Sequence, residues 1–275
     1  MNKKDQKAEV TKSNLLKDSA RIFAPKTKAA FEAIYDYVEL ACEVANDQKN
    51  ERAAKDLADM RRQTEDAIET GRHLNPVIKR FAEVVRMYKI DEECIEALFE
   101  SLYMDVVNST FTAKEYRKYI QGLGEALGLM ALKIICYKRS VLYHKLIPAG
   151  RAFGAAICKV DLLLEHGQVH KRRGRMYFPD VTRSTFNQAR LAQIIVDIEA
   201  DFRVVRSAIP SFPPGTKTAA TLVYVYYYDL LQQMRHLTPA QIDAGQAKIS
   251  PYKKYYLLAR TYAWPQSALQ RGSRY

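Results

Sequence analysis

The sequence lacks the features that mark secreted, membrane-spanning or zinc-binding proteins. It has four cysteines in 275 residues, and no two of them have the Cys-x-x-Cys spacing of a zinc site. The N-terminus has no apolar segment typical of a signal peptide, and no apolar run reaches the ~18–20 residues of a membrane span. These absences favour a protein of the reducing cytoplasm with buried free thiols at Cys42, Cys94, Cys136 and Cys158.

Strong β-strand signals, such as alternating Val, Ile and Thr or Asn-Gly turns, are nearly absent as well. Hydrophobic residues make up 48% of the chain and recur every three to four positions, which is typical of helices around a sizeable core. The formal net charge of +12 favours an anionic partner: a phosphate, an acidic membrane surface or a nucleic acid. Charge alone does not choose among the three.

We predict an all-α protein with about ten helices in one layered bundle. A flexible charged N-terminus (1–13) and a tail (266–275) flank a single helical domain (14–265). The predicted helices and connections are Ser13–Phe23, Thr27–Asn46, a charged linker Asp47–Asp59, a helix ending at Thr70, Asn75–Lys89, Asp91–Tyr103, Thr112–Tyr119 leading into Gly122–Arg139, a helix that Pro148 begins, Asn187–Ile209, a loop Pro210–Gly215, Thr216–Met234, a short helix capped by Thr238, and Pro251–Tyr262.

Two of these helices carry acidic residues four positions apart, which places each set on one helix face. The first set is Glu39, Glu43 and Asp47, and the second is Asp161 and Glu165. If the faces oppose each other across a bundle, their carboxylates could hold Mg²⁺. The alternative is that each is simply the solvated face of an amphipathic helix.

A basic segment, Lys171–Arg175, follows the second acidic helix and ends in Tyr177-Phe178-Pro179. Guanidinium groups bind phosphate through paired hydrogen bonds. An acid pair beside this segment would therefore suit magnesium and a diphosphate. Runs of Lys and Arg are also common on solvated surfaces, so this segment alone does not decide between the two interpretations.

Three further features have both a structural and a functional interpretation. Asp105 stands near the end of an apolar helix, where a helix cap is the simpler role and a place in the same cavity is the alternative. The tyrosine-rich segment 224–228 is interpreted as packing, although some rings could wall a pocket and stabilise a carbocation. His166 and His170 have the spacing of a zinc pair but no third ligand, so zinc is not expected.

The order of segments resembles the squalene/phytoene synthase family, especially its bacterial members, from about Ser19 to Tyr262. The residues that carry the resemblance are Ala33–Val38, Thr70–Val77, Leu102–Asp105, Tyr119–Met130 and Phe153–Pro179. The resemblance implies an isoprenoid-synthase bundle in which two acidic motifs face each other and Mg²⁺ bridges them to prenyl diphosphates. It also implies an apolar cavity that excludes water from a carbocation. NADPH is not expected.

The resemblance implies specific site residues. The implied catalytic residues are Tyr35, Glu43, Glu165 and Tyr177; the implied substrate-binding residues are Asn46, Asp105, Tyr119 and Arg175; and the implied metal ligands are Glu43, Asp47, Asp161 and Glu165.

The first acidic motif departs from the family pattern Arg-x2-Asp-Asp/Glu-x2-Asp. Glu39 stands in place of the arginine, and Cys42 and Asn46 stand in place of acids, so that Glu43 alone keeps its carboxylate. Asp47 is a partial substitute at most, because it is rotated by about 100° around the helix.

The second motif departs from the pattern Asn-x2-Arg-Asp-x3-Asp in a similar way. Leu164 stands in place of the arginine and Val169 in place of the last acid, whereas Glu165 keeps an acid and Asp161 adds one. Fewer magnesium ions than in active relatives are expected, because several ligands are missing.

Three functions therefore stay open from the sequence. The first is a prenyltransferase that condenses two prenyl diphosphates in isoprenoid or carotenoid biosynthesis, with impaired or altered activity. The second is a catalytically inactive isoprenoid-binding or assembly protein. The third, a basic binder of nucleic acid or membrane surface, has no recognition motif to support it, so nucleic acid is not expected. Peripheral contact with a membrane is compatible with all three.

Overall fold

The computed structural model describes residues 23–46, 52–182 and 184–247, and nearly all of the regular structure in them is helical. The elements are α2 (Pro25–Asn46), α3 (Ala53–Thr70), α4 (Pro76–Tyr88), α5 (Glu92–Val107), α6 (Ala113–Ile120), the π-helical turn η1 (Gln121–Ala126), α7 (Leu127–Ile135), α8 (Ser140–Arg173), α9 (Gln188–Ala208), the 3₁₀ turn η2 (Ile209–Ser211), α10 (Pro214–Arg235) and α11 (Pro239–Asp243). The predicted all-α bundle is confirmed. The predicted segment 1–13, most of the predicted helix 13–23, Asp47, the predicted helix 251–262 and the tail 266–275 lie outside the described residues.

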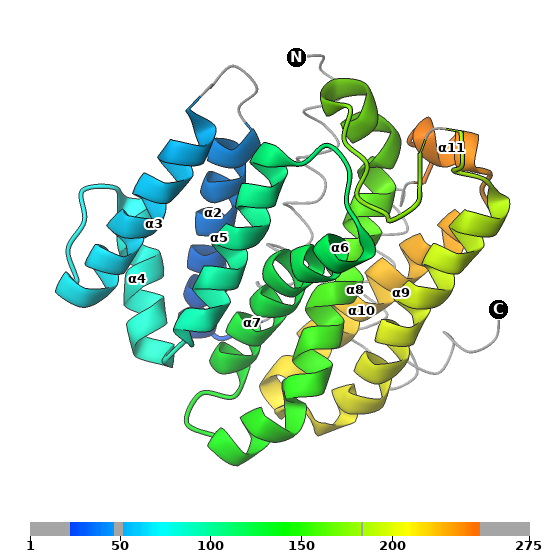
Figure 1. Cartoon of the computed structure of the whole chain (residues 1–275). Helices are drawn as coiled ribbons and strands as arrows, with labels where there is room; N and C mark the ends of the chain where they lie inside the picture. Colours follow the sequence, from blue (N-terminus) through cyan, green and yellow to red (C-terminus); the bar gives the residue numbers. More distant parts are fainter. Residues whose placement is uncertain (1–22, 47–51, 183, 248–275) are drawn as a thin grey trace.

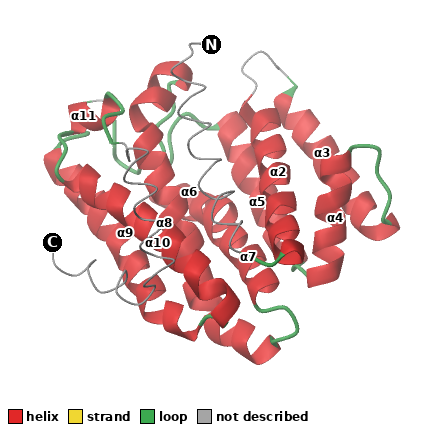
Figure 2. Cartoon of the chain, turned by 180° about the vertical axis from the view of Figure 1, so that it is seen from behind, coloured by secondary structure: helices red, strands yellow, loops and turns green. Residues whose placement is uncertain are grey.

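The bundle has two halves and a middle layer (Figure 1). Helices α2 to α5 pack together on one side, α8, α9 and α10 on the other, and α6, η1 and α7 lie between them. Figure 2 shows the same arrangement from behind. Each half has its own apolar core, one around Tyr37, Phe81 and Leu98, the other around Leu163 and Phe202. The two helices with acidic faces, α2 and α8, therefore belong to different halves. Within the ranges given above, no helix is both long and apolar enough to cross a membrane.

Several helices begin where their side chains satisfy free backbone groups. The Asn75 side chain accepts a hydrogen bond from the backbone of the first turn of α4. Thr112 and Glu115 form a capping box at the start of α6, and Thr238 and Gln241 form another at the start of α11. The predicted starts of these three helices are confirmed.

Other predicted boundaries are wrong. Helix α8 begins at Ser140, and Pro148 lies within it rather than at its start. Pro148 is exposed, so its ring lies on the solvent side of α8. Proline has no N–H to donate, and water can hydrogen-bond to the carbonyl group that is left without a helical partner. The predicted linker 47–59 is also too long, because α3 begins at Ala53. The apolar helix ends at Ile135 instead of Arg139, and a turn follows.

Helix α8 packs against the middle layer at glycines that face each other. A Cβ atom on Gly154 would lie 2.1 Å from the carbonyl oxygen of Gly124 in η1. A Cβ atom on Gly128 of α7 would lie 2.0 Å from the carbonyl oxygen of Gly150. Such distances leave no room for any side chain, so α8 lies directly against η1 and α7. This contact fixes the position and orientation of α8, the helix that carries Asp161 and Glu165, relative to η1 and α7.

Candidate functional site

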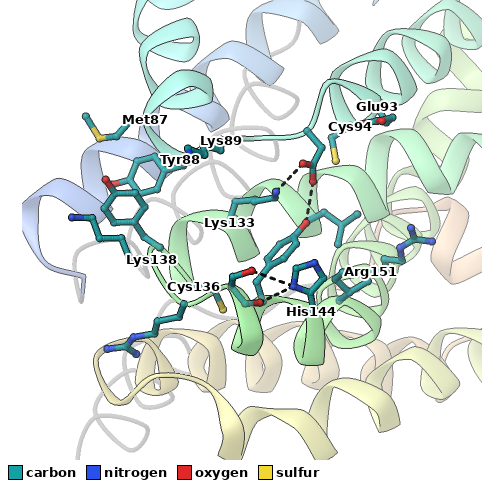
Figure 3. Close-up of a pocket in the computed structure, with 17 residues that line it drawn as sticks. Met87, Tyr88, Lys89, Glu93, Cys94, Lys133, Cys136, Lys138, His144 and Arg151 are labelled. Carbon is teal, nitrogen blue, oxygen red and sulfur yellow. Dashed lines mark hydrogen bonds and ion pairs between the residues drawn. The ribbon is translucent and has the colours of Figure 1, made fainter.

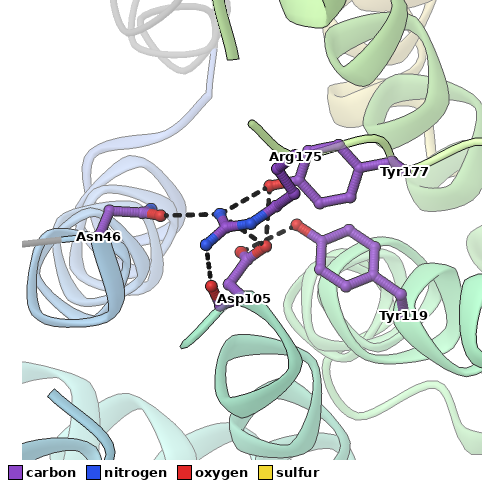
Figure 4. Close-up of polar contacts among 5 residues, drawn as sticks. All are labelled: Asn46, Asp105, Tyr119, Arg175 and Tyr177. Atoms are coloured by element: carbon purple, nitrogen blue, oxygen red, sulfur yellow. Dashed lines mark hydrogen bonds and ion pairs between the residues drawn. The ribbon is translucent and has the colours of Figure 1, made fainter. Parts of the chain in front are cut away.

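A buried polar cluster forms where the C-terminal end of α5 meets the segment that follows α8 (Figure 4). Asp105, in the last turn of α5, is only 2% exposed. Its Oδ2 accepts a hydrogen bond from the Tyr119 hydroxyl at 3.0 Å, and its Oδ1 accepts one from the Tyr177 hydroxyl at 2.8 Å. The Arg175 Nη1 lies 3.2 Å from the same Oδ1. One buried carboxylate therefore holds two phenols and a guanidinium.

The chain turns back at the end of α8 to bring Arg175 into this cluster. Gly174 has a φ of 64°, the left-handed conformation that commonly ends helices, and its N–H donates to the His170 carbonyl. The Met176 N–H then donates to the Ser109 carbonyl at 2.8 Å, just beyond the end of α5. These backbone bonds place the segment after α8 beside Asp105.

Arg175 also reaches across the bundle to the first motif. Its Nη1 lies 3.4 Å from the Asn46 Oδ1 at the end of α2, and its Nη2 donates to the backbone carbonyl of Asp105. The same guanidinium lies 3.2 Å from the Tyr177 hydroxyl. Arg175 thus links α2, α5 and the segment after α8.

The surroundings of the cluster keep it dry and keep the phenols protonated. Tyr119 and Tyr177 pack at 5.0 Å between ring centroids, and Phe111 packs against both. Burial, and then the Asp105 charge, raise the pKa of both phenols well above the ordinary value. Burial acts to lower the pKa of Arg175, but Tyr177 and Asp105 outweigh it and raise that pKa. The cluster is therefore a charged pair with two protonated hydroxyl donors.

The interpretation of Asp105 as a helix cap is wrong, because its side chain points into this cluster and Asn108 occupies the C-cap position. The interpretation of the basic segment as a solvated surface fails for Arg175, which is 9% exposed, and holds for Lys171, which is exposed. The structure brings Asn46, Asp105, Tyr119, Arg175 and Tyr177 together, all of them implied by the family resemblance.

The second acidic motif meets the tyrosines of α10. The fully buried hydroxyl of Tyr227 is hydrogen-bonded to Asp161, and burial followed by that carboxylate raises the pKa of Tyr227 well above its ordinary value. Tyr35 of α2 lies close enough to add to this shift. Glu165, one turn beyond Asp161, is half-buried. Tyr224 and Tyr226 are buried too, which agrees with a packing role for the tyrosine-rich segment.

The first acidic motif is more exposed than the second. Glu39 and Glu43 are exposed on α2, as a solvated face would be. Cys42, between them, packs against the apolar core of the first half. Asp47, the remaining acid of this face, lies outside the described residues. All four cysteines are free, and three are buried, whereas Cys42 is half-buried.

The comparisons with known proteins agree with this geometry. The family model described as squalene/phytoene synthase matches residues 19–253, which is most of the chain. The chain belongs to the squalene/phytoene synthase family. Comparison with curated protein sequences found no match.

Two solved structures resemble this squalene/phytoene synthase family member. A dehydrosqualene synthase in complex with ligand is similar with a TM-score of 0.75 and 18% identity, over 90% of each chain. YisP from Bacillus subtilis subsp. subtilis strain 168 is similar with a TM-score of 0.53 and 20% identity, over 84% of this chain and 98% of that one. At such identities the likeness shows a shared fold.

The acidic residues that the structure describes are not gathered into a metal cluster. Nowhere in residues 23–46, 52–182 and 184–247 do three or more His, Cys, Asp or Glu side chains come together as metal ligands would. Leu164 and Val169, two of the departures from the family pattern predicted from the sequence, pack against the apolar core of the second half. Cys42, a third predicted departure, packs against the core of the first half.

Sequence reasoning missed an ion-pair network between α8 and α9, in which the lysine is buried and the two acids are partly or fully exposed. The Lys159 Nζ lies 2.6 Å from Asp197 Oδ2 and 2.9 Å from Asp201 Oδ2. Burial acts to lower the pKa of Lys159, but the two carboxylates outweigh it and raise that pKa. The signal was a lysine within the apolar run 155–164, where an unpaired charge would be costly. On the same helix, the His166 Nδ1–H donates a hydrogen bond to the Asp243 Oδ1 of α11 at 2.8 Å.

Proposed function

We propose that this chain binds prenyl diphosphates at the end of the bundle where α2, α5 and the segment after α8 meet. We propose further that it acts on them as a squalene/phytoene synthase-like prenyltransferase of reduced or altered activity. The observation that carries this proposal is the buried cluster of Asp105, Arg175 and Tyr177, which holds a guanidinium beside Asn46 of the first motif. Family membership supplies the reaction class.

The retained residues suit the binding of a diphosphate. A guanidinium and protonated phenols are hydrogen-bond donors, and Arg175 and Tyr177 present both kinds next to the first motif. In the proposed reaction, the allylic C–O bond breaks and the diphosphate leaves with the electron pair. Donors that strengthen their hydrogen bonds as this charge develops would speed the step. Glu43 and Glu165 are the carboxylates that keep the acid of the family pattern.

The reduction in activity follows from the ligands that are missing. Metal ions supply several kcal/mol of charge stabilisation to reactions of this kind. The described carboxylates form no metal cluster, and Cys42 and Val169 offer no oxygen ligand. The second candidate function, binding of an isoprenoid without turnover, is favoured by one specific observation: the Arg175 guanidinium is already paired with Asp105.

The deciding experiment is diphosphate release by the purified protein from farnesyl or geranylgeranyl diphosphate, with and without Mg²⁺. We expect slow, Mg²⁺-dependent release that disappears in the double variant Glu43→Ala, Glu165→Ala. The matched control is Glu69→Ala, Glu83→Ala, which removes two exposed acids from α3 and α4 and should leave release unchanged.

Calorimetric titration of the same substrates separates the two candidates. Binding without any release would replace the proposed transferase by the binding protein. Neither binding nor release would overturn both. Equal release by the Glu43→Ala, Glu165→Ala variant and the wild type would show that the acidic motifs play no part.

A further inference from the structure

A large cavity lies at the opposite end of the bundle from the Asp105 cluster, and Figure 3 shows the residues that line it. It has a volume of about 920 Å³ and lies between the last turn of α4, the start of α5, the turn after α7 and the start of α8. Cys94 lines it, and Asp105 lies about 16 Å further along the same helix α5. Arg175 follows the far end of α8, whose 34 residues span about 50 Å. The cavity is therefore separate from the candidate active site.

Cationic side chains outnumber acidic ones around this cavity. The charged lining residues are Lys89, Lys133, Lys138, Arg139 and Arg151 against Asp91 and Glu93. Two of the cations already have partners. The Lys133 Nζ lies 2.8 Å from Asp91 Oδ1 and over the ring of Tyr143, and the Arg151 Nη1 lies 3.7 Å from Glu125 Oε2.

The other three cations, Lys89, Lys138 and Arg139, are exposed and form no ion pair with the residues that the structure describes. The Lys138 Nζ lies 5.5 Å from the ring centroid of the exposed Tyr137, a contact that leaves its charge open to an anion. Lys89 ends α4, and Lys138 and Arg139 lie in the turn between α7 and α8, so that the three come from two neighbouring connections. In Figure 3, Lys138 lies on the side of Tyr88 and Met87. Unpaired cations grouped at a cavity mouth favour an anionic ligand.

The rim of the cavity also exposes large apolar side chains. Met87 and Tyr137 line the cavity and are 57% and 44% exposed, and Val141, beside the lining residue Ser140, is 87% exposed. A soluble anion or a nucleic acid would leave these side chains in water. Basic residues interspersed with exposed apolar ones are typical of proteins that rest on an anionic membrane surface.

We propose that this cavity and its rim are a docking site for an anionic phospholipid in a membrane surface. Lys89, Lys138 and Arg139 hold the headgroup phosphate, and Met87, Tyr137 and Val141 enter the boundary between headgroups and acyl chains. The inference rests on this end of the molecule alone and does not depend on prenyl transfer. It orients the bundle with the start of α8 towards the lipid and the Asp105 cluster away from it.

The test is sedimentation of the full-length protein with vesicles of phosphatidylcholine alone or mixed with phosphatidylglycerol. We expect binding to the mixed vesicles, and a fall in the partition coefficient on the order of 100-fold in the triple variant Lys89→Gln, Lys138→Gln, Arg139→Gln. The matched control, Lys55→Gln, Lys114→Gln, Arg117→Gln, removes the same charge from exposed positions on α3 and α6. It should keep binding within about threefold, because distant charges are screened.

A second variant tests the apolar contact. Val141→Asn should weaken binding to mixed vesicles by about tenfold. Circular dichroism and urea unfolding show whether each exposed variant folds as the wild type does. No preference for anionic vesicles would overturn the proposal, and so would equal weakening by both triple variants. Normal vesicle binding by Val141→Asn, together with full competition by inorganic phosphate or duplex DNA, would assign the cations to a soluble anion or nucleic acid instead.

Discussion

Asp105 is a buried acid whose oxygens receive hydrogen bonds from Tyr119, Tyr177 and Arg175. Removing a charged pair from water costs several kcal/mol, and such pairs are tolerated when hydrogen bonds satisfy the remaining oxygens and protons. These three partners come from other elements, α6 and the segment after α8. The pair therefore holds the end of the bundle together as well as forming the candidate site.

We predict that Asp105→Asn lowers the free energy of unfolding by about 3–5 kcal/mol, because it leaves the Arg175 charge buried without its partner. Urea unfolding followed by circular dichroism measures the change. The double variant Asp105→Asn, Arg175→Gln should be more stable than the single variant, since no uncompensated charge remains. Additive losses in the two single variants and the double variant would show that the two side chains are not coupled.

The members of this cluster could be named from the sequence, but their geometry could not. The family resemblance predicted Asp105 together with Tyr119, Arg175 and Tyr177. The residues next to Asp105 in the sequence favoured a helix cap instead, because its partners lie up to 72 positions away. Helix and capping propensities depend only on residues a few positions apart in the sequence, so they do not indicate such distant partners. The pairing of Lys159 with α9 was missed for the same reason, although a lysine in an apolar run is itself a signal.

At the scale of elements, the helices were predicted well where side chains cap them and poorly where packing decides. The caps at Asn75, Thr112 and Thr238 are local and were found. The sequence did not predict that α8 continues through Pro148. A proline on the exposed side of a long, well-packed helix destabilises that helix less than it would destabilise an isolated one. The π-helical turn η1 also has no local signature beyond its glycines.

We predict that Gly154→Ala destabilises the protein by about 1–3 kcal/mol, because its Cβ atom would collide with the Gly124 carbonyl and push α8 away from η1. Gly215→Ala is the matched control: nothing lies within 4 Å of a Cβ atom there, in the first turn of α10. That variant should be as stable as the wild type or up to about 1 kcal/mol more stable. Equal unfolding midpoints in urea for both variants would show that α8 can move at no cost.

The whole molecule hides many phenols in its two cores. Burial raises the pKa values of Tyr37, Tyr119, Tyr177 and Tyr227 above the ordinary value near 10. In the unfolded chain these phenols ionise near pH 10, whereas in the folded chain they keep their protons. Above that pH the unfolded state binds fewer protons, so the folded state loses stability as the pH rises.

We predict that the free energy of unfolding is insensitive to these phenols below about pH 10 and falls above it by about 1.4 kcal/mol per pH unit for each phenol. Urea unfolding at a series of alkaline pH values measures the slope. Tyr37→Phe keeps the ring stacked on Phe81 and removes one phenol, so its slope should be shallower by about one such increment. A slope identical to that of the wild type would show that Tyr37 does not contribute.

The overall architecture followed from hydrophobic periodicity and composition, because both report which faces of helices are apolar. The separation of the apolar residues into a core in each half and a smaller third cluster around Leu132 and Tyr143 did not follow from them, since it depends on which helices meet. The basic cavity likewise assembles residues from the ends of several helices, and no segment of the sequence displays it alone.

The packing of Cys42, Leu164 and Val169 limits how this bundle can be redesigned. The three side chains are partly buried and pack against the apolar cores of the two halves. An acid or arginine at any one of them would remove apolar packing and place a charge beside hydrophobic side chains. Each such substitution therefore costs stability. New charged groups on α2 are better tolerated at exposed positions, such as those of Glu39 and Glu43.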